Sequence, residues 1–566
     1  MHSATTTPTS KDVPISVRAV AIWLVLFCAL GLFLRIQAPY FYSYSGDEAI
    51  QANVAGGESF AQVLHFARHE ANPPLLHILL HYWLKLSTNP SFARLLSLLP
   101  GLALIPLYYF IGARMGGQIS GLCCAGLVAL SFGGIVQSTV LRMYGILLVC
   151  LSMNLLCYLR WRDSGRLMDL FGYVVFGWLA IASHFTAALY ILSIATFGLY
   201  SMRHMERKHI AWWAFANGAV TAMFAMLYLL WQPTLSFLHA HDGGIYLKNT
   251  AILTDRIVGA MATPLLAANY ICPAGLLLVA LAYAASGRMK KPNSSSPAIQ
   301  LAVWGSLLSA GLFVTGIYPA LGTRHSLWMF PLLIPAAGQM IANAIRRTVR
   351  KAGGFPIGAI IAGVAACALA DMWAQLAFSG EYAYWQQGPA QDMQQALAGL
   401  KPDDVIITDR HLLDAMDNQF RFRTDPVFMN EQKPRLSPYH DTQILVSPDY
   451  FEVYDGKAVM TMVRQAEAAG LLKNTRRLVF AQFYYDLPLM RDLLSCATLV
   501  TQPIYHFDPA AKETVPASQP TGLVAIGVPK QNFLDGFVPP SGKAPGCYDE
   551  SHDKPEPYMP MTARHR

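Results

Sequence analysis

The feature that most constrains this chain is a succession of apolar runs, each close to the length needed to cross a lipid bilayer. A membrane span needs about 20 mostly apolar residues, because the hydrocarbon core is about 30 Å thick. Of the 566 residues, 54% are hydrophobic and 13% are charged, whereas soluble proteins are about one quarter charged. The sequence therefore predicts a mainly α, polytopic membrane protein with about 11 spans, and about 11 to 13 are compatible with the pattern. The predicted spans are residues 19–38, 92–112, 117–137, 141–159, 169–183, 184–202, 211–231, 257–285, 300–320, 324–345 and 354–376.

Basic residues between these runs indicate which loops face the cytoplasm. Cytoplasmic loops collect Lys and Arg, so the net charge of +8 does not require a nucleic-acid partner, and the sequence has no nucleic-acid-binding motif. We expect residues 1–18 to be a flexible cytoplasmic segment, the first run to be an uncleaved helix, and the chain to end outside the cytoplasm. Residues 74–88 are short for a span and are expected to form a juxtamembrane or half-inserted helix. The clusters expected in the cytoplasm are Arg114, residues 160–166, 203–208, 288–291 and 346–351.

An acidic pair, Asp47 and Glu48, follows the first span in a loop that this topology places outside the cytoplasm. A carboxylate just beyond a span, facing water, can take a proton from an incoming hydroxyl group. The alternative is a solvated loop whose charges only keep it out of the bilayer. Further charges of the same loop, Glu58 and Arg68, fit this alternative better than the adjacent pair does.

Several basic side chains are expected on the same side of the membrane as the acidic pair. Arg142, beside Tyr144, is either an interfacial arginine at lipid headgroups or a cation that holds a lipid phosphate. Arg324 opposes the usual bias of positive charge toward the cytoplasm, and its guanidinium can bind two phosphate oxygens at once, although it can also serve only as a topological anchor. His184 lies where two short spans meet, a position more typical of a hydrogen-bonded structural histidine than of a catalyst. The polar segments that the topology brings to this side are 41–72, 137–144, 232–256 and 318–325.

Short motifs along the chain resemble those of a known class of membrane enzymes. An acidic pair after the first span and the pattern HExNPPLLH at 69–77 are followed by LRMYGILL at 141–148, SHFTAALYI at 183–191 and TRHSLWMFPLLIPAAG at 323–338. In this order the motifs resemble the GT-C class of membrane glycosyltransferases. Within it, they are similar to the branch of the protein O-mannosyltransferases, aminoarabinose transferases and lipopolysaccharide-core transferases. The resemblance covers residues 19–376, which are expected to form a transmembrane catalytic domain with residues 41–88 as its first outer loop.

The resemblance implies an enzyme that takes a sugar from a polyprenyl-phosphate donor and passes it, with inversion, to a glycolipid, polysaccharide or protein acceptor. It also implies an integral protein of the bacterial inner membrane, with the reaction on the outer face and the C-terminal domain outside the cytoplasm. Asp47 would be the general base, with Glu48 positioning it or bonding to the sugar. Arg324, helped by Arg142, would bind the donor phosphate. The residues expected to contact substrate or acceptor are His69, Glu70, Tyr144, His184 and His325.

From about residue 377 the composition changes to that of a small soluble domain. Short β-branched runs at 405–408, 443–446 and 477–483 alternate with helical patterns at 387–400 and 457–473. This alternation predicts an α/β domain over 377–505 with a mostly parallel sheet. No glycine-rich phosphate loop follows its first strand, so a nucleotide site is not expected. The proline-rich tail, 506–566, is expected to be extended.

Neither the cysteines nor the histidines form a recognisable cofactor site. Most cysteines lie in apolar runs, where they act as small hydrophobic residues, and the alternate spacing of His239 and His241 suits a polar loop better than a metal site. No cofactor is expected, and a divalent metal is not supported by the sequence. Cys496 and Cys547, both expected outside the cytoplasm, are candidates for a disulfide that closes a loop of about fifty residues.

The sequence alone leaves two other classes of function open. A transporter or flippase for a lipid-linked sugar would line its path with the same polar residues. Transporters, however, commonly have two matching halves and polar breaks near the midplane, whereas here the polar residues gather at helix ends. A non-catalytic envelope assembly protein would use the C-terminal domain to bind partners.

Overall fold

The computed structural model describes helices in the first two thirds of the chain and a small sheet in the last third. It describes residues 15–36, 44, 46–57, 59–68, 70, 72–202, 206–247, 262, 264–272, 275, 279, 296–314, 324–352, 400–408, 435–439, 442–446, 456–482 and 524–534. The chain divides into two compact units. Unit 1 comprises Met1–Tyr40, Arg94–Leu229 and Tyr246–Leu376, and unit 2 comprises Phe41–Ala93, Leu230–Ile245 and Ala377–Arg566.

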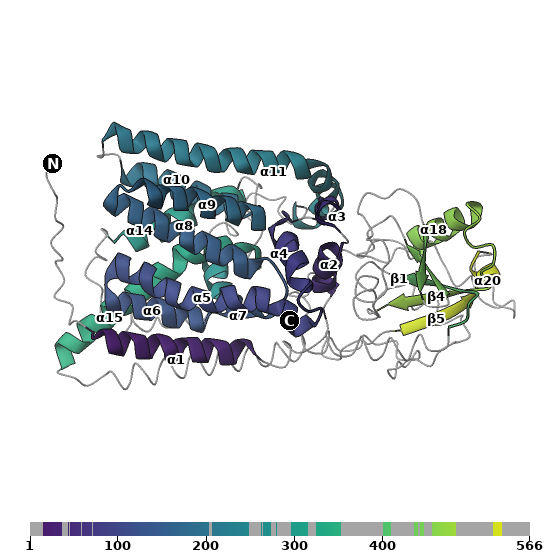
Figure 1. The fold of residues 1–566 in the computed structure, drawn as a ribbon, viewed down its shortest axis with the longest axis horizontal. Coiled ribbons are helices and arrows are strands. Elements are labelled where there is room, and N and C mark those ends of the chain that lie inside the picture. Colours follow the sequence, from purple (N-terminus) through teal and green to yellow (C-terminus); the bar gives the residue numbers. More distant parts are fainter. Residues whose placement is uncertain are drawn as a thin grey trace. The chain divides into compact units, whose positions relative to one another are not determined.

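Unit 1 is a bundle of helices that run side by side (Figure 1). Among the described residues, six helices are long and apolar enough to cross a membrane, or seven if one bent pair counts as a single span. Two further apolar helices, α9 and α10, are shorter, with 17 and 15 residues. The predicted spans 257–285 and 354–376 lie largely or wholly outside the described residues. The elements are α1 (Val17–Arg35), α5 (Pro90–Gly116), α6 (Gln118–Ala129), α7 (Phe132–Thr139), α8 (Tyr144–Ser164), α9 (Leu167–Ser183), α10 (Ala187–Ser201), α11 (Arg207–Leu247), α14 (Pro297–Val314), the 3-10 helix η3 (Arg324–Met329) and α15 (Phe330–Ala352).

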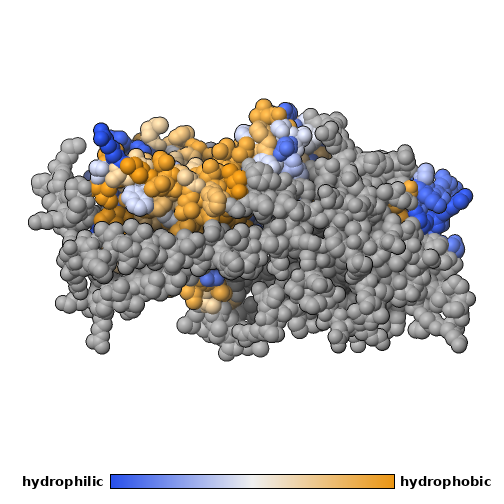
Figure 2. Space-filling view, turned by 90° about the horizontal axis from the view of Figure 1, so that it is seen from below, coloured by the Kyte–Doolittle hydropathy of each residue, from blue (hydrophilic) through white to orange (hydrophobic). Residues whose placement is uncertain are grey.

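The surface of this bundle is apolar where a membrane would surround it. In the face shown in Figure 2, the coloured side chains of the helical part are mostly hydrophobic. On α1, large side chains such as Ile22, Val25 and Phe33 are more than half exposed. Exposed apolar side chains at this density are unfavourable in water and are expected in contact with lipid. The predicted α-helical integral membrane fold is confirmed.

Ion pairs and basic side chains mark one end of the bundle, which we call the loop end. There Arg114 of α5 pairs with Asp163 of α8 at 3.0 Å, and Arg160 pairs with Asp169 of α9 at 2.9 Å. Arg346 of α15 reaches the same end and donates to the carbonyl of Gly116. The turn from α8 to α9 is tight because Gly165 adopts a left-handed conformation (φ 66°), and its N–H caps α8 at the carbonyl of Trp161. Three of the basic clusters predicted to share one side of the membrane are thus together.

The predicted span 117–137 is a broken helix. Its two parts, α6 and α7, are bent by 50°. Ser131 makes the break, because its hydroxyl accepts a hydrogen bond from the N–H of Gly134 (3.0 Å) and donates one to the carbonyl of Ile271 (2.5 Å). A serine in this position caps the new helix and keeps its own polar group paired.

The predicted loop 232–256 is wrong in its first part, because α11 continues as a helix to Leu247. Pro233 lies inside this helix, and a single proline removes one backbone hydrogen bond without necessarily ending the helix. Beside it, the indole N–H of Trp231 donates to the carbonyl of Ala67 at 3.1 Å and anchors this part of α11 within unit 2.

The first part of unit 2 consists of three short helices, α2 (Gly46–Ala55), α3 (Phe60–Ala67) and α4 (Leu75–Leu84). The helix expected over 74–88 is α4, with only 10 residues. Two of the helix ends are capped by side chains from elsewhere in the unit. Nδ1 of His81 donates to the carbonyl of Ala55 at the end of α2 (2.9 Å), and Trp231 does the same for Ala67 at the end of α3.

The second part of unit 2 is a five-stranded sheet in the order β2-β3-β1-β4-β5. The three predicted strands form its parallel centre, and the predicted helix that precedes the last of them is α18 (Gly456–Ala468). The sheet is mixed rather than mostly parallel, because β2 and β5 add antiparallel edges, and β5 lies in the range expected to be an extended tail. The predicted helix 387–400, apart from its last residue, lies outside the described residues. Cys496 and Cys547 also lie outside them, so the disulfide stays a prediction. The strands are β1 (Asp404–Thr408), β2 (Arg435–Tyr439), β3 (Thr442–Val446), β4 (Arg477–Gln482) and β5 (Val524–Pro529), followed by α20 (Lys530–Leu534).

A buried ion pair between β1 and β4 gives a test of this sheet. Arg477 donates from Nε to Oδ1 of Asp404 at 2.7 Å and also contacts Oδ2, and the Asp404 side chain is only 2% exposed. Asp404→Ala leaves a largely buried guanidinium without its carboxylate and should destabilise the sheet by about 3–5 kcal/mol. Hydrogen exchange of the β1 and β4 amides in the full chain, followed by mass spectrometry, measures this effect.

The adjacent pair provides a matched control. Arg476 and Asp403 lie 3.3 Å apart, but their side chains are 87% and 34% exposed. Asp403→Ala should therefore cost less than about 1 kcal/mol. Equal acceleration of exchange in the two variants would contradict the register of β1 against β4.

Candidate functional site

The acidic residues predicted as catalytic lie on α2 in unit 2. Asp47 is in the first turn of this helix, and Glu48 beside it is fully buried. Glu70 is also buried, at 5% exposure, whereas His69 lies outside the described residues.

The basic residues predicted as phosphate ligands lie in unit 1, at the opposite end of the bundle from the loop end. Arg142 sits in the short turn between α7 and α8, and its side chain is only 9% exposed. Ser97 of α5 holds the backbone of this turn from both sides. Its hydroxyl donates to the Arg142 carbonyl at 3.0 Å and accepts from the Arg142 N–H at 3.3 Å. The arginine is therefore presented by a backbone that is fixed before any ligand binds.

His184 is fixed in a similar way, in the turn between α9 and α10. Its backbone is extended and its N–H caps α9 at the carbonyl of Ala180. Nδ1 of its ring accepts a hydrogen bond from the N–H of Thr186 (3.1 Å) and lies 2.8 Å from the Thr186 hydroxyl. Because a backbone N–H can only donate, Nδ1 carries no proton, and the ring proton of neutral His184 is on Nε2.

The rings around His184 bring the predicted site residues of unit 1 together. Its centroid lies 5.4 Å from the ring of Tyr144 and 5.9 Å from that of His325. His325 and Arg324 begin η3, which packs against α7, α8 and α10 and leads into α15. Both are partly exposed, whereas Tyr144 is buried. We call Arg142, His184, Arg324 and His325 the basic cluster.

The charge of the basic cluster changes the protonation of His184. This turn lies outside the membrane-spanning helices, and burial, together with the electrostatic effect of His325, Arg142 and Arg324, lowers the pKa of His184 to about 3. At neutral pH His184 is therefore an uncharged ring that offers its Nε2–H as a donor. Two guanidinium groups and a neutral donor in one place suit an anion with several oxygens, such as a phosphate.

Two buried arginines of unit 1 were not among the predicted site residues. Arg35 ends α1 and Arg94 is the fifth residue of α5, and both are fully buried. Each stands at the non-cytoplasmic end of a predicted span, as Arg324 does. Both therefore carry the sequence signal that distinguishes Arg324, a positive charge on the side of the membrane where basic residues are uncommon.

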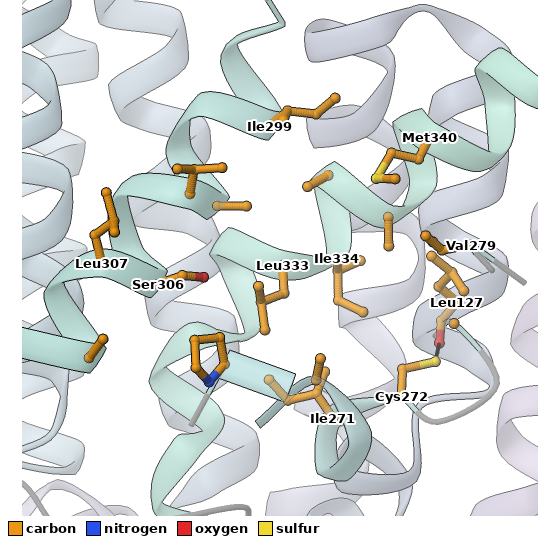
Figure 3. Close-up of a pocket in the computed structure, with 18 of the residues that line it drawn as sticks. Leu127, Ile271, Cys272, Val279, Ile299, Ser306, Leu307, Leu333, Ile334 and Met340 are labelled. Carbon is orange, nitrogen blue, oxygen red and sulfur yellow. Dashed lines mark hydrogen bonds between the residues drawn. The ribbon is translucent and has the colours of Figure 1, made fainter. Parts of the chain in front are cut away.

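An apolar pocket of about 590 Å³ opens in unit 1 between α14, α15 and residues 264–272, 275 and 279 (Figure 3). Its lining along α14 extends from Ile299 to Val314, most of the length of that helix. The polar side-chain groups in the lining are the hydroxyl of Ser306 and the thiol of Cys272, which is 3.6 Å from the carbonyl of Leu127. A pocket with this lining suits a hydrocarbon chain and not a polar ligand.

Comparison with known proteins gives matches to solved structures alone: no family model and no curated protein sequence matches the chain. ArnT from Cupriavidus metallidurans bound to undecaprenyl phosphate matches with a TM-score of 0.52 and 14% identity, over 90% of this chain and 98% of that one. The same protein in the apo state has a TM-score of 0.49 and 13% identity, with the same coverage. The oligosaccharyltransferase of Archaeoglobus fulgidus has a TM-score of 0.48 and 12% identity, over 81% of this chain and 69% of that one.

The first of these matches shows that this chain shares its fold with ArnT over nearly the whole length of both proteins. The resemblance to GT-C membrane enzymes that the motifs predicted is thereby confirmed at the level of the fold. Identity of 14% leaves the roles of individual residues untested.

The lowered pKa of His184 predicts a pH dependence of stability. Its folded-state pKa of about 3 lies below the ordinary value of 6.5, so between these values the unfolded chain binds a proton that the folded chain does not. Stability should therefore fall as the pH drops from 6.5 toward 3, by up to about 1.4 kcal/mol per pH unit from this group, and should not change on its account above 6.5.

His184→Asn isolates this contribution, because an amide oxygen can still accept from Thr186 and does not titrate. Thermal unfolding midpoints between pH 7 and 5 should fall less steeply in this variant than in the parent chain. If His184→Asn showed the same slope as the parent chain, folding would not lower the pKa of His184.

Proposed function

We propose that this protein is a membrane glycosyltransferase of the GT-C type that moves a sugar from a polyprenyl-phosphate donor to an envelope acceptor, with inversion. The observation that carries the proposal is the basic cluster at one end of a membrane-spanning bundle whose fold is shared with ArnT. The proposed acceptor is a glycolipid, a polysaccharide or a protein. Both the membrane and the lipid-linked donor are partners of the helical unit.

The basic cluster suits the phosphate of such a donor. Negative charge grows on the phosphate as the bond to the sugar breaks, so fixed donors around it stabilise the transition state. Arg142 and Arg324 supply charge and paired hydrogen bonds. Neutral His184 adds an Nε2–H donor without adding a further buried charge. The ring of Tyr144 lies beside that of His184 and lines the same site.

The apolar pocket beneath this end suits part of the polyprenyl chain. It is lined almost entirely by apolar groups of helices that cross the membrane, so a lipid-linked donor can enter it from the bilayer. This pairing of a phosphate site with an apolar pocket favours a lipid phosphate over a soluble sugar nucleotide.

In the proposed reaction the acceptor oxygen bonds to the anomeric carbon as the bond from that carbon to the phosphate oxygen breaks. The electron pair leaves with the polyprenyl phosphate, and the acceptor proton passes to Asp47. Glu48 holds this base or bonds to the sugar, while His69, Glu70 and His325 contact the acceptor or sugar. A single displacement inverts the configuration, and its atoms balance without a cofactor.

The proposed location is the bacterial inner membrane, with the reaction on the outer face and the sheet domain outside the cytoplasm. The basic clusters of the loop end support this, since they mark a cytoplasmic side. Tags after Lys351 and at the C-terminus should be reachable from the inside and the outside, respectively. A C-terminal tag on the inside would reverse the assignment for the sheet domain.

A transfer assay tests the reaction itself. Purified protein in detergent, given polyprenyl-phosphate sugars and envelope extract from cells that lack the gene, should form a glycosylated product and free polyprenyl phosphate. Asp47→Asn keeps the size of the side chain but removes the base, so transfer should fall by about two orders of magnitude or more. A flippase would instead move the donor across vesicles without cleaving it.

The variants Glu48→Gln and Asp163→Asn complete this test. Asp163 is an acid of the loop end, and its substitution should leave transfer near the parent level. Near-normal transfer by Asp47→Asn would mean that Glu48 or another group is the base. No cleavage of any donor by the parent protein would contradict the proposed function.

A further inference from the structure

Arg35 is a charge that the reaction proposed above does not use. It is the last residue of α1, a helix that otherwise shows large apolar side chains to its surroundings, and its own side chain is 0% exposed. Burying a guanidinium is costly unless it is hydrogen-bonded. Its contacts therefore indicate what the rest of the fold gains from this residue.

The guanidinium of Arg35 contacts backbone carbonyls. Nη1 donates to the carbonyl of Gly31 at 2.9 Å and approaches that of Ala129 at 3.5 Å, while Nη2 lies 3.4 Å from that of Val128. Val128 and Ala129 end α6 at the break before α7. The last carbonyls of a helix lack partners within it and form its negative end, so Arg35 caps α6 from a neighbouring helix.

Apolar packing also connects the end of α1 to α7, on the other side of the break. Leu34, next to Arg35, forms a buried cluster with Leu130 in the break and Ile135 of α7. The end of α1 thus contacts α6, the break and α7 together. The 50° bend between α6 and α7 is held by one polar and one apolar contact from α1.

The direction of α7 matters for the basic cluster because Arg142 follows the end of α7 by three residues. Gly101 of α5 lets α7 come close, since a Cβ there would collide with the hydroxyl of Ser138 and would lie 3.5 Å from Nε of Arg35. One turn earlier on α5, Ser97 holds the Arg142 backbone. The contact between α5, α7 and Arg35 is therefore one helical turn along α5 from the residue that holds the turn at Arg142.

We propose that Arg35 is a positioning residue of the donor-phosphate site, which sets the bend between α6 and α7 and thereby the position of Arg142. It acts through the backbone and does not touch the donor. Its effect on donor binding rests on the proposed function, but its effect on the turn at Arg142 does not.

A double-mutant cycle on the binding of polyprenyl phosphate to the purified full chain tests the coupling. Arg35→Met and Arg142→Met should each weaken binding by about tenfold or more, and the double variant should bind no more weakly than Arg142→Met alone. Arg114→Met, at the other end of α5, is the control and should leave binding unchanged. If the loss of affinity in the double variant equalled the product of the two single losses, the two residues would act independently, and the proposal would be overturned.

A second measurement does not depend on donor binding. In Arg142→Cys the new thiol reports the turn, and its reaction rate with a charged thiol reagent should change by several-fold when Arg35→Met is added, with the parent chain measured as background. If Arg35→Met does not fold, Arg35→Lys takes its place, because a lysine keeps the charge but cannot reach all three carbonyls. An unchanged rate would refute the positioning role, whereas a changed rate in a protein that binds no polyprenyl phosphate would refute only the proposed function.

Discussion

The cost of burying positive charge among apolar helices governs the arrangement of unit 1. At the loop end the arginines are partly exposed and pair with Asp163 and Asp169, so they stay in or near water. At the other end Arg35, Arg94 and Arg142 are buried. A fold keeps such groups only where dipoles or an anion compensate them. For Arg35 the compensation includes the carbonyls at the end of α6. The basic cluster lies at the same end of the bundle, and we propose that it binds a phosphate.

Short helices and helix breaks expose the backbone N–H and C=O groups that can compensate a buried charge. The break at Ser131, the turn at Arg142 and the turn at His184 all expose peptide groups at one end of the bundle. Each is closed by a hydrogen bond: within the turn between Ser131 and Gly134 and between Thr186 and His184, and from α5 between Ser97 and Arg142. Donors fixed in this way need little reorganisation when charge develops on a ligand, which is the condition for electrostatic catalysis.

Much of the fold and part of the site could be predicted from the sequence. Apolar runs of span length gave the helices, and counting them between basic clusters brought Arg142, His184 and Arg324 to one side. The bend at Ser131 could not be predicted, because it depends on the carbonyl of Ile271, which is distant in sequence. The helical state of residues 232–247 was missed because glycines and polar residues there are typical of a loop. The edge strands β2 and β5 were missed because Pro438 and Pro529 weaken a strand pattern, although prolines are tolerated at sheet edges.

The environment of His184 could be predicted from the sequence only in part. Thr186 two residues later is a local signal for the hydrogen bond that fixes the ring. Its low pKa depends first on burial and then on the electrostatic effect of His325, Arg142 and Arg324, which lie in other segments of the chain. Arg35 was overlooked for a related reason: an arginine at the end of an apolar run is normally an interfacial residue, and only the packed structure shows that it is fully buried.

The most direct measurement of the central claim is a cryo-electron microscopy structure of the purified protein with a saturating polyprenyl phosphate. The account predicts phosphate density within about 3 Å of the guanidinium groups of Arg142 and Arg324 and of Nε2 of His184. It also predicts that the hydrocarbon chain enters the pocket along α14. Phosphate density at Arg160 or elsewhere at the loop end, with the basic cluster unoccupied at saturation, would contradict it.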